Sequence, residues 1–105
     1  MPQFSVYKNK NKHSREQYPY LLDVQTALLD KLETCMVVPL VELHELRGKP
    51  LTVVMPVFEI DGKSLVMLTP QMAGIARKEL GAEVASLAHK RDEIVAALDF
   101  LVTGI

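Results

Sequence analysis

Hydrophobic and polar residues alternate in two segments near the start of the chain, residues 3–7 and 20–25. This period of two, in residue types that favour strands, predicts two half-buried β-strands that pair antiparallel. The segment between them, residues 8–17, is polar and carries four cations together with His13, which predicts a mobile surface loop. Residues 28–30 then predict a short helical turn or bend.

The middle of the chain begins with a near-continuous apolar run over residues 34–40. Such a run predicts a strand that is covered on both faces, and Pro39 is expected to mark its end. Residues 41–50 carry more charge and finish in Arg47-Gly48-Lys49-Pro50, which is a loop signature.

Two apolar runs, residues 56–60 and 63–68, flank the dipeptide Asp61-Gly62. They predict a tight β-hairpin, because glycine tolerates the positive φ that a primed turn requires. Thr69-Pro70 is expected to end the second strand of this hairpin.

The pattern changes again towards the C-terminus. Residues 72–80 are compatible with either a helix or a strand, and from about Ala82 onward the spacing of apolar residues is helical. The residues on this helical face are Val84, Leu87, Ala88, Arg91, Ile94, Val95, Leu98, Leu101 and Val102, and Arg91 is its one polar member. We therefore expect a mainly β protein: five or more antiparallel strands in a small curled sheet or barrel, followed by one C-terminal helix.

Length and composition limit the possible functions. A chain of 105 residues is long enough for one hydrophobic core, so residues 1–105 are expected to form a single domain. Hydrophobic residues make up 49% of the chain, which is more than so small a body covers and therefore favours a homodimer. The formal net charge of −1 argues against general binding of nucleic acid. The apolar segments are too short for a signal peptide or a membrane span, and a cytoplasmic location is expected.

Residues suited to catalysis or metal binding are few and scattered. His13, His44 and His89 match no zinc-binding spacing, and the sequence has no phosphate-binding loop, dinucleotide fingerprint or nucleophile elbow. Cys35 lies in the apolar run, which predicts a buried and unreactive thiol. By its residues alone, the chain predicts a binding module without enzymatic activity, metal or cofactor.

The chain ends in an apolar tip, because the expected helix is followed directly by Gly104 and Ile105. A left-handed conformation at Gly104 would turn the chain away from the helix axis. Ile105 is then either offered to a partner or folded back over Leu101. The pair Leu28-Leu29 presents the same two alternatives, and we expect one of these leucines to be buried and the other exposed.

Several blocks, in matching order over essentially the whole chain, resemble the CcdB family of toxins, the gyrase poisons of toxin–antitoxin modules. These blocks are residues 3–7, 23–25, 36–40, 56–60 with the hairpin, 72–73, 81–87 and the terminal Gly104-Ile105. The resemblance implies a homodimer of SH3-like-barrel subunits, with the C-terminal helices beside the twofold axis.

The resemblance also implies that the dimer wedges into the dimerisation domain of the gyrase A subunit and traps the enzyme on cleaved DNA. The positions that would face gyrase are Gln3, Phe4, Tyr7, Thr26, Leu28, Leu29, Asp99, Thr103, Gly104 and Ile105. A CcdA-like antitoxin with a disordered C-terminal tail would wrap the toxin and extract it from gyrase. Toxin and antitoxin together would repress their own operon, and the operator DNA would be contacted through the antitoxin.

Two positions depart from the family pattern. The best-known members place tryptophan directly before the final Gly-Ile, stacked against a gyrase arginine, where this chain has Thr103. Stacking a cation on an aromatic ring contributes about 0.5–2 kcal/mol, which threonine does not supply. Asp99 stands where the family usually has asparagine, and it adds a charge to the contact surface. The loop around residues 41–49, which would face the antitoxin, is also divergent.

Two further functions stay open at the level of the sequence. The related Kid and MazF families cut RNA with the same fold, and a ribonuclease site would recruit Arg77, Lys78 and His44, although no spacing points to such a site. The other is a chromosomal relic that binds an antitoxin but has lost its toxicity, which Thr103 favours.

Overall fold

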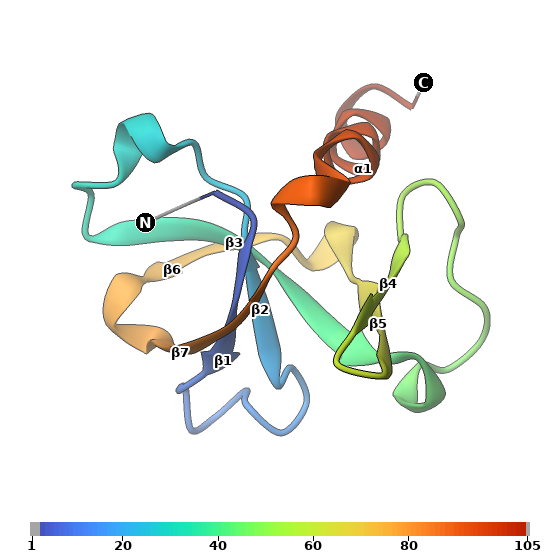
Figure 1. The fold of residues 1–105 in the computed structure, drawn as a ribbon, viewed down its shortest axis with the longest axis horizontal. Helices are drawn as coiled ribbons and strands as arrows, with labels where there is room; N and C mark the ends of the chain where they lie inside the picture. Colours follow the sequence, from blue (N-terminus) through green and yellow to red (C-terminus); the bar gives the residue numbers. More distant parts are fainter. Residues whose placement is uncertain (1–2, 105) are drawn as a thin grey trace.

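The computed structural model describes residues 3–104, and its strands form a curled antiparallel sheet (Figure 1). The strands are β1 (Ser5–Asn9), β2 (Tyr20–Asp23), β3 (Thr34–Glu42), β4 (Val57–Ile60), β5 (Lys63–Met67), β6 (Ala73–Ala76) and β7 (Leu80–Ser86). Their order is β4-β5-β3-β2-β1-β7, and β6 pairs with β3. The helix α1 (Arg91–Thr103) follows the last strand. The expected fold class is confirmed, with seven strands in place of about five.

The long strand β3 connects the two halves of the sheet. One of its edges pairs with β2 over residues 37–40. Its other edge pairs with β6 over residues 34–37 and with β5 over residues 40–42. Pro39, which has no N–H to donate, lies between these two ladders, and its carbonyl accepts a hydrogen bond from the Leu68 N–H at 2.9 Å. The prediction that Pro39 ends the strand is therefore wrong.

The hairpin of β4 and β5 is confirmed. Ile60 pairs with Lys63 across the turn, and both central residues have positive φ, 51° at Asp61 and 78° at Gly62. This combination defines the primed turn that matches the twist of the two strands. The inward side chains of the hairpin, among them Phe58, join the main hydrophobic core.

The segment that begins near Ala82 is a strand, whereas its spacing predicted a helix. β7 pairs antiparallel with β1, and the register shifts on both sides of Tyr7. The two strands come so close that a Cβ at Gly81 would lie 2.9 Å from the Lys8 carbonyl oxygen. So short an apolar segment is compatible with either period, and the pairing with β1 decides in favour of the strand.

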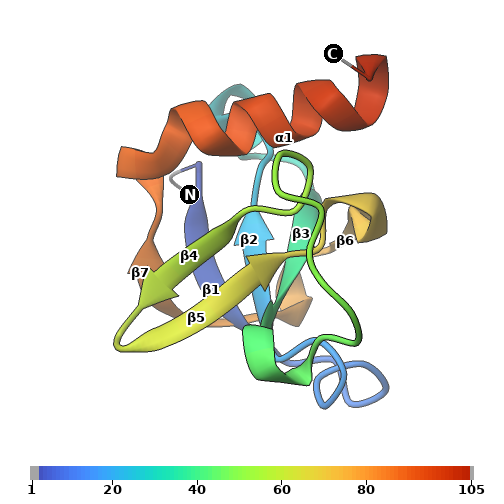
Figure 2. The ribbon, with the colours of Figure 1, turned by 90° about the vertical axis from the view of Figure 1, so that its right-hand side faces the viewer.

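The helix α1 lies across one end of the curled sheet (Figure 2). It begins at Arg91, about nine residues later than the pattern indicated, and it buries Ile94 and Ala97 completely. Val95 and Leu98 also pack against the core, as expected. Leu101 and Val102, in the last turn of the helix, are 36% and 78% exposed. Within residues 3–104, no helix has the length and apolar character that crossing a membrane requires.

Candidate functional site

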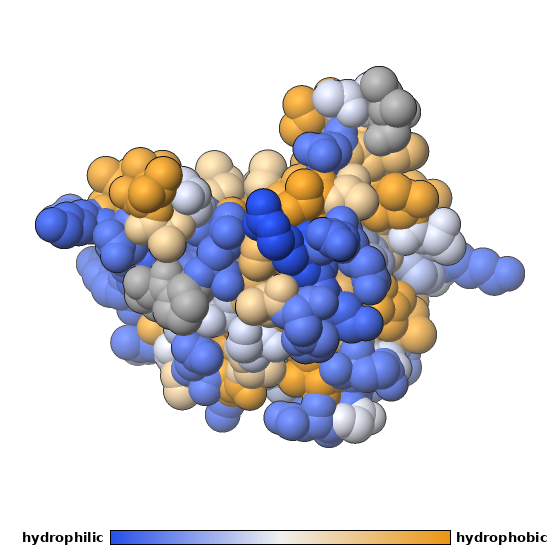
Figure 3. Space-filling view, turned by 45° about the horizontal axis from the view of Figure 1, so that its top comes forward, coloured by the Kyte–Doolittle hydropathy of each residue, from blue (hydrophilic) through white to orange (hydrophobic). Residues whose placement is uncertain are grey.

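Exposed hydrophobic side chains gather at two places on one face of the molecule, over the loop between β2 and β3 and over α1, with hydrophilic residues between them (Figure 3). The exposed residues of these two areas are Leu28, Leu29, Leu32, Phe100, Leu101 and Val102. Loop and helix are far apart in sequence but lie at the same end of the sheet (Figure 1). Exposed apolar areas of this kind mark interaction sites.

The loop contribution comes from a short 3-10 helix, η1 (Ala27–Leu29). Thr26 caps its start, because the Thr26 Oγ1 accepts a hydrogen bond from the Leu28 N–H at 3.4 Å. Leu28 is 91% exposed and Leu29 is 45% exposed. The expectation that one of the two is buried is wrong, since η1 projects from the sheet and buries none of its residues.

Three predicted contact positions lie at the start of the chain, and two of them are buried. Phe4 and Tyr7 are 3% and 5% exposed, and they belong to two separate core clusters. Gln3 is half-buried, and its side-chain Nε2 donates to the Val24 carbonyl oxygen at 3.1 Å. The sequence places these residues near a partner, whereas the structure gives their side chains intramolecular contacts.

The end of α1 carries the remaining described positions of the predicted site. Asp99 and Thr103 are exposed, and the Thr103 Oγ1 donates to the Asp99 carbonyl oxygen at 2.8 Å. Gly104 has φ 75°, and its N–H donates to the Phe100 carbonyl oxygen at 2.9 Å. Gly104 therefore ends the helix in the left-handed conformation that was expected. Ile105 lies outside the described residues.

Six of the predicted positions are exposed in the structure, three on the β2–β3 loop and three at the end of α1: Thr26, Leu28, Leu29, Asp99, Thr103 and Gly104. It adds Leu32, Phe100 and Val102, which were not predicted. The spacing of apolar residues places Val102 on the buried face of the helix, and this spacing does not show that Val102 is 78% exposed. Leu32 follows two charged residues in a loop, and no pattern in the sequence predicts whether this leucine is exposed or buried.

The groups that a ribonuclease site would recruit are far apart in the structure. His44 lines a cleft with Glu42, Lys63 and Ser64, and its Nε2 lies 3.2 Å from the Glu45 Oε1. Arg77 and Lys78 line a different cleft beside the β2–β3 loop. Cleavage of RNA requires an acid, a base and a cation that converge on one phosphate, and these three groups do not converge.

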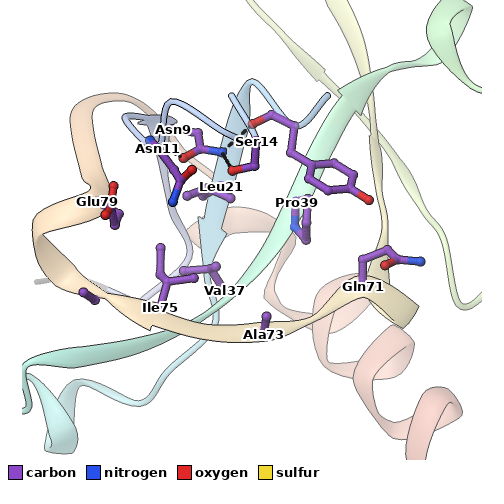
Figure 4. Close-up of a pocket in the computed structure, with 12 residues that line it drawn as sticks. Asn9, Asn11, Ser14, Leu21, Val37, Pro39, Gln71, Ala73, Ile75 and Glu79 are labelled. Atoms are coloured by element: carbon purple, nitrogen blue, oxygen red, sulfur yellow. Dashed lines mark hydrogen bonds between the residues drawn. The ribbon is translucent and has the colours of Figure 1, made fainter. Parts of the chain in front are cut away.

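A further cleft of about 360 Å³ lies beside β6 (Figure 4). Its walls combine apolar side chains, among them Leu21, Val37 and Ile75, with polar ones such as Asn9. The buried amide of Asn9 beside it serves the loop that follows β1: its Nδ2 donates to the Ser14 Oγ at 3.0 Å and to the Tyr18 carbonyl oxygen at 2.9 Å. Since both donors of this amide are engaged within the loop, Asn9 offers neither of them to a ligand in the cleft.

The single cysteine is confirmed as a buried thiol. Cys35 is 0% exposed, and burial together with the nearby Asp23 carboxylate raises the pKa of its thiol to about 12. A neutral thiol is a poor nucleophile and a poor metal ligand. In the part of the chain that the structure describes, no group of three or more His, Cys, Asp and Glu side chains is placed to hold a metal ion.

The family described as "CcdB protein" matches residues 3–104. The fold resembles an endoribonuclease in complex with its cognate antitoxin from a mycobacterial species (TM-score 0.72, 16% identity, 97% of this chain and 95% of that chain covered). It also resembles the Mycobacterium tuberculosis toxin MazF-mt6 (TM-score 0.69, 13% identity, 90% and 92% covered). At such identities the two structures share a fold, which does not by itself define an activity. Because the family match spans residues 3–104, the chain belongs to the CcdB family, as its sequence blocks predicted.

Proposed function

We propose that this protein is the toxin of a toxin–antitoxin module and that it acts by binding the A subunit of DNA gyrase, without catalysis of its own. The observation that carries the proposal is the face with two exposed apolar areas, one on the β2–β3 loop and one on α1. Burial of a leucine or valine side chain contributes roughly 1.5–3 kcal/mol, so a surface with Leu28 and Val102 in solvent is suited to a partner. Membership of the CcdB family supports gyrase as that partner.

The same face supports a homodimer. The outer half of α1 extends beyond the sheet, and Phe100 and Leu101 are about one third exposed, at 37% and 36%. A second copy packed against these residues would remove them from water, in the arrangement of helices beside a twofold axis that the family resemblance implies. The end of each helix would then remain available for gyrase.

We further propose that a CcdA-like antitoxin neutralises the toxin in the cytoplasm. Its tail would compete for the same face and extract the toxin from gyrase. The complex would repress its own operon, with the operator bound by the antitoxin, because the net charge of −1 gives the toxin little attraction for DNA.

Thr103 gives this protein a different balance of contacts from the best-known family members. Its hydroxyl already donates to the Asp99 carbonyl oxygen, and it has no ring to stack on a cation. The leucines of the β2–β3 loop therefore carry a larger share of the binding energy. If they do not compensate, the protein is an attenuated homologue that binds its antitoxin without poisoning gyrase.

A ribonuclease is the second candidate, because one of the two structural neighbours is described as an endoribonuclease. The separation of His44 from Arg77 and Lys78 into different clefts counts against it. The Arg77 guanidinium is also engaged, since its Nε donates to the Leu32 carbonyl oxygen at 2.7 Å.

The experiment is to express the protein in wild-type cells and in cells whose gyrase A subunit is altered in its dimerisation domain. Growth arrest that the gyrase alteration rescues, and that Leu28→Ala weakens, supports the proposal. Leu51→Ala is the matched control, because Leu51 is a 65% exposed leucine outside the two areas. Arrest that persists in the altered strain with accumulating RNA fragments identifies a ribonuclease. Normal growth of every strain overturns toxicity and leaves the attenuated homologue.

A further inference from the structure

The β2–β3 loop presents exposed leucines although none of its side chains is buried. All residues from Thr26 to Thr34 are exposed, so hydrophobic packing within the subunit does not hold this segment in place. We name residues 26–34 the recognition loop. Its conformation therefore depends on hydrogen bonds, some within the loop, such as that from the Leu29 N–H to the Thr26 carbonyl oxygen at 3.0 Å, and others from residues outside it.

Arg77 supplies three of these hydrogen bonds from one side. Its backbone N–H donates to the Glu33 carbonyl oxygen at 2.8 Å. In its side chain, Nε donates to the Leu32 carbonyl oxygen at 2.7 Å and Nη2 donates to the Leu29 carbonyl oxygen at 3.1 Å. The planar guanidinium carries several donors that suit such a cluster of carbonyl oxygens. The Leu29 carbonyl oxygen also accepts from the Leu32 N–H at 3.2 Å.

The position of Arg77 in the fold makes this contact possible. Arg77 is the first residue of η4 (Arg77–Glu79), directly after β6. β6 pairs antiparallel with the start of β3, where Ala76 lies opposite Thr34. The ladder thus brings Arg77 against the end of the recognition loop, 45 residues away from Leu32 in sequence.

Gln25 holds the same loop from the other side. Its Nε2 donates to the carbonyl oxygens of Leu29 and Thr34 at 3.1 and 3.2 Å, and its Oε1 accepts from the Met36 N–H at 3.1 Å. The Leu29 carbonyl oxygen therefore receives donors from both Gln25 and Arg77. These hydrogen bonds fix the backbone of the loop in a conformation that leaves the Leu28 and Leu29 side chains exposed to solvent.

From this arrangement we infer that Arg77 is a positioning residue for partner recognition: it fixes the recognition loop so that Leu28, Leu29 and Leu32 form a preformed apolar contact surface. The inference rests on the proposed binding of gyrase through this face. A loop that is already ordered loses less conformational entropy when a partner binds. Loss of Arg77 should therefore weaken binding more than it weakens the fold.

The test measures the affinity of the purified full-length protein for the dimerisation-domain fragment of gyrase A. Arg77→Met keeps much of the side-chain length and removes the guanidinium. Lys78→Met is the matched control, since it removes the same charge from the adjacent, exposed position. We expect Arg77→Met to weaken binding roughly tenfold, the size associated with a lost charge-assisted hydrogen bond, and Lys78→Met to change it by less than about twofold.

Two further readouts distinguish positioning from a general structural role. Amide hydrogen exchange in residues 27–34 should accelerate in Arg77→Met, while exchange in β1, β2 and the core of β3 stays the same. In a double-mutant cycle, Leu28→Ala should weaken binding less in the Arg77→Met background than in the wild type, because a mobile loop no longer presents Leu28. A residue that merely supported the fold would show additive effects.

Wild-type affinity in Arg77→Met, or unchanged exchange in the loop, overturns the inference. If Arg77→Met lowers the melting temperature of the whole domain, Arg77→Lys decides: intermediate affinity at unchanged melting temperature supports positioning, and wild-type affinity refutes it. Absence of binding by the wild type itself overturns the proposed function, and with it the role of Arg77 in gyrase recognition. Accelerated loop exchange in Arg77→Met would then still show that Arg77 orders the loop, so the two failures are distinguishable.

Discussion

Phe4 and Leu28 are both expected gyrase contacts by resemblance, but the structure predicts opposite consequences for their replacement. The Phe4 ring is 3% exposed and lies in the main core, whereas Leu28 is 91% exposed on the recognition loop. We therefore expect Phe4→Ala to act on folding and Leu28→Ala to act on binding.

The size of the Phe4 effect follows from its surroundings. Truncation of a buried phenylalanine to alanine destabilises by about 3–5 kcal/mol. The Arg91 guanidinium lies 5.9 Å from the ring centroid, and loss of such an exposed cation–π contact adds about 0.5–1 kcal/mol. The positive φ of 71° at Phe4 is equally unfavourable for alanine, so backbone strain does not offset the loss. Against a total stability of about 5–15 kcal/mol, this is a large fraction.

The assay is urea unfolding of both variants and the wild type at one protein concentration, which matters because a homodimer would be stabilised by mass action. With an unfolding slope of about 2 kcal/mol per molar urea, Phe4→Ala should lower the midpoint by roughly 2 M. Leu28→Ala should change stability by less than about 0.5 kcal/mol, while weakening the binding of the gyrase fragment.

If Phe4→Ala unfolds within about 0.5 M urea of the wild type and yet loses gyrase binding, the Phe4 ring reaches the partner and its place in the core does not determine its role. A loss of stability in Leu28→Ala as large as that expected for Phe4→Ala would equally contradict the exposure of the loop.

Three further substitutions test other parts of the structure. Gly81→Ala places a Cβ 2.9 Å from the Lys8 carbonyl oxygen; it should destabilise by about 1–3 kcal/mol through forced separation of β1 and β7, and an unchanged melting temperature would show that the strands are not so close. The Cys35 pKa is raised to about 12 from 9.0, so the native thiol keeps a proton that the unfolded chain releases above pH 9, and stability should fall as pH rises from 9 to 12. This decline should be smaller in Cys35→Ala, and equal slopes in the two proteins would contradict the raised pKa. Asp99→Asn removes a negative charge near the C-terminal end of α1, where the helix dipole disfavours it; we expect a gain in stability of about 0.3–1 kcal/mol, measured by thermal unfolding at low salt, and no gain there would place Asp99 outside the reach of the dipole.

Much of the fold follows from short stretches of sequence. The hairpin at Asp61-Gly62 is specified locally, because the turn requires positive φ at two neighbouring residues and the flanking runs are apolar. The strands that begin near Gln3 and Tyr20 alternate clearly, and the burial of Cys35 follows from its apolar neighbours. In each case the determining residues lie within a few positions of one another.

The elements that were assigned wrongly are those whose structure depends on distant residues. The apolar spacing after Ala82 is compatible with a helix, and only the pairing of β7 with the distant strand β1 makes this segment a strand. Pro39 by itself predicts the end of a strand. In the structure, β6 pairs with β3 before Pro39 and β5 pairs with β3 after it, so the strand continues through the proline.

What the sequence alone determined is the family, the mainly β class with a C-terminal helix, and the positions at which recognition was to be sought. The tertiary structure decided which of those positions are available: the rings of Phe4 and Tyr7 are inside, and Leu28, Leu29 and the end of α1 are outside. It also placed Arg77 against the recognition loop. The physical reason is that exposure and hydrogen bonding between distant segments are properties of the assembled sheet, since a residue's neighbours along the chain do not show where the sheet ends or which side chain reaches across it.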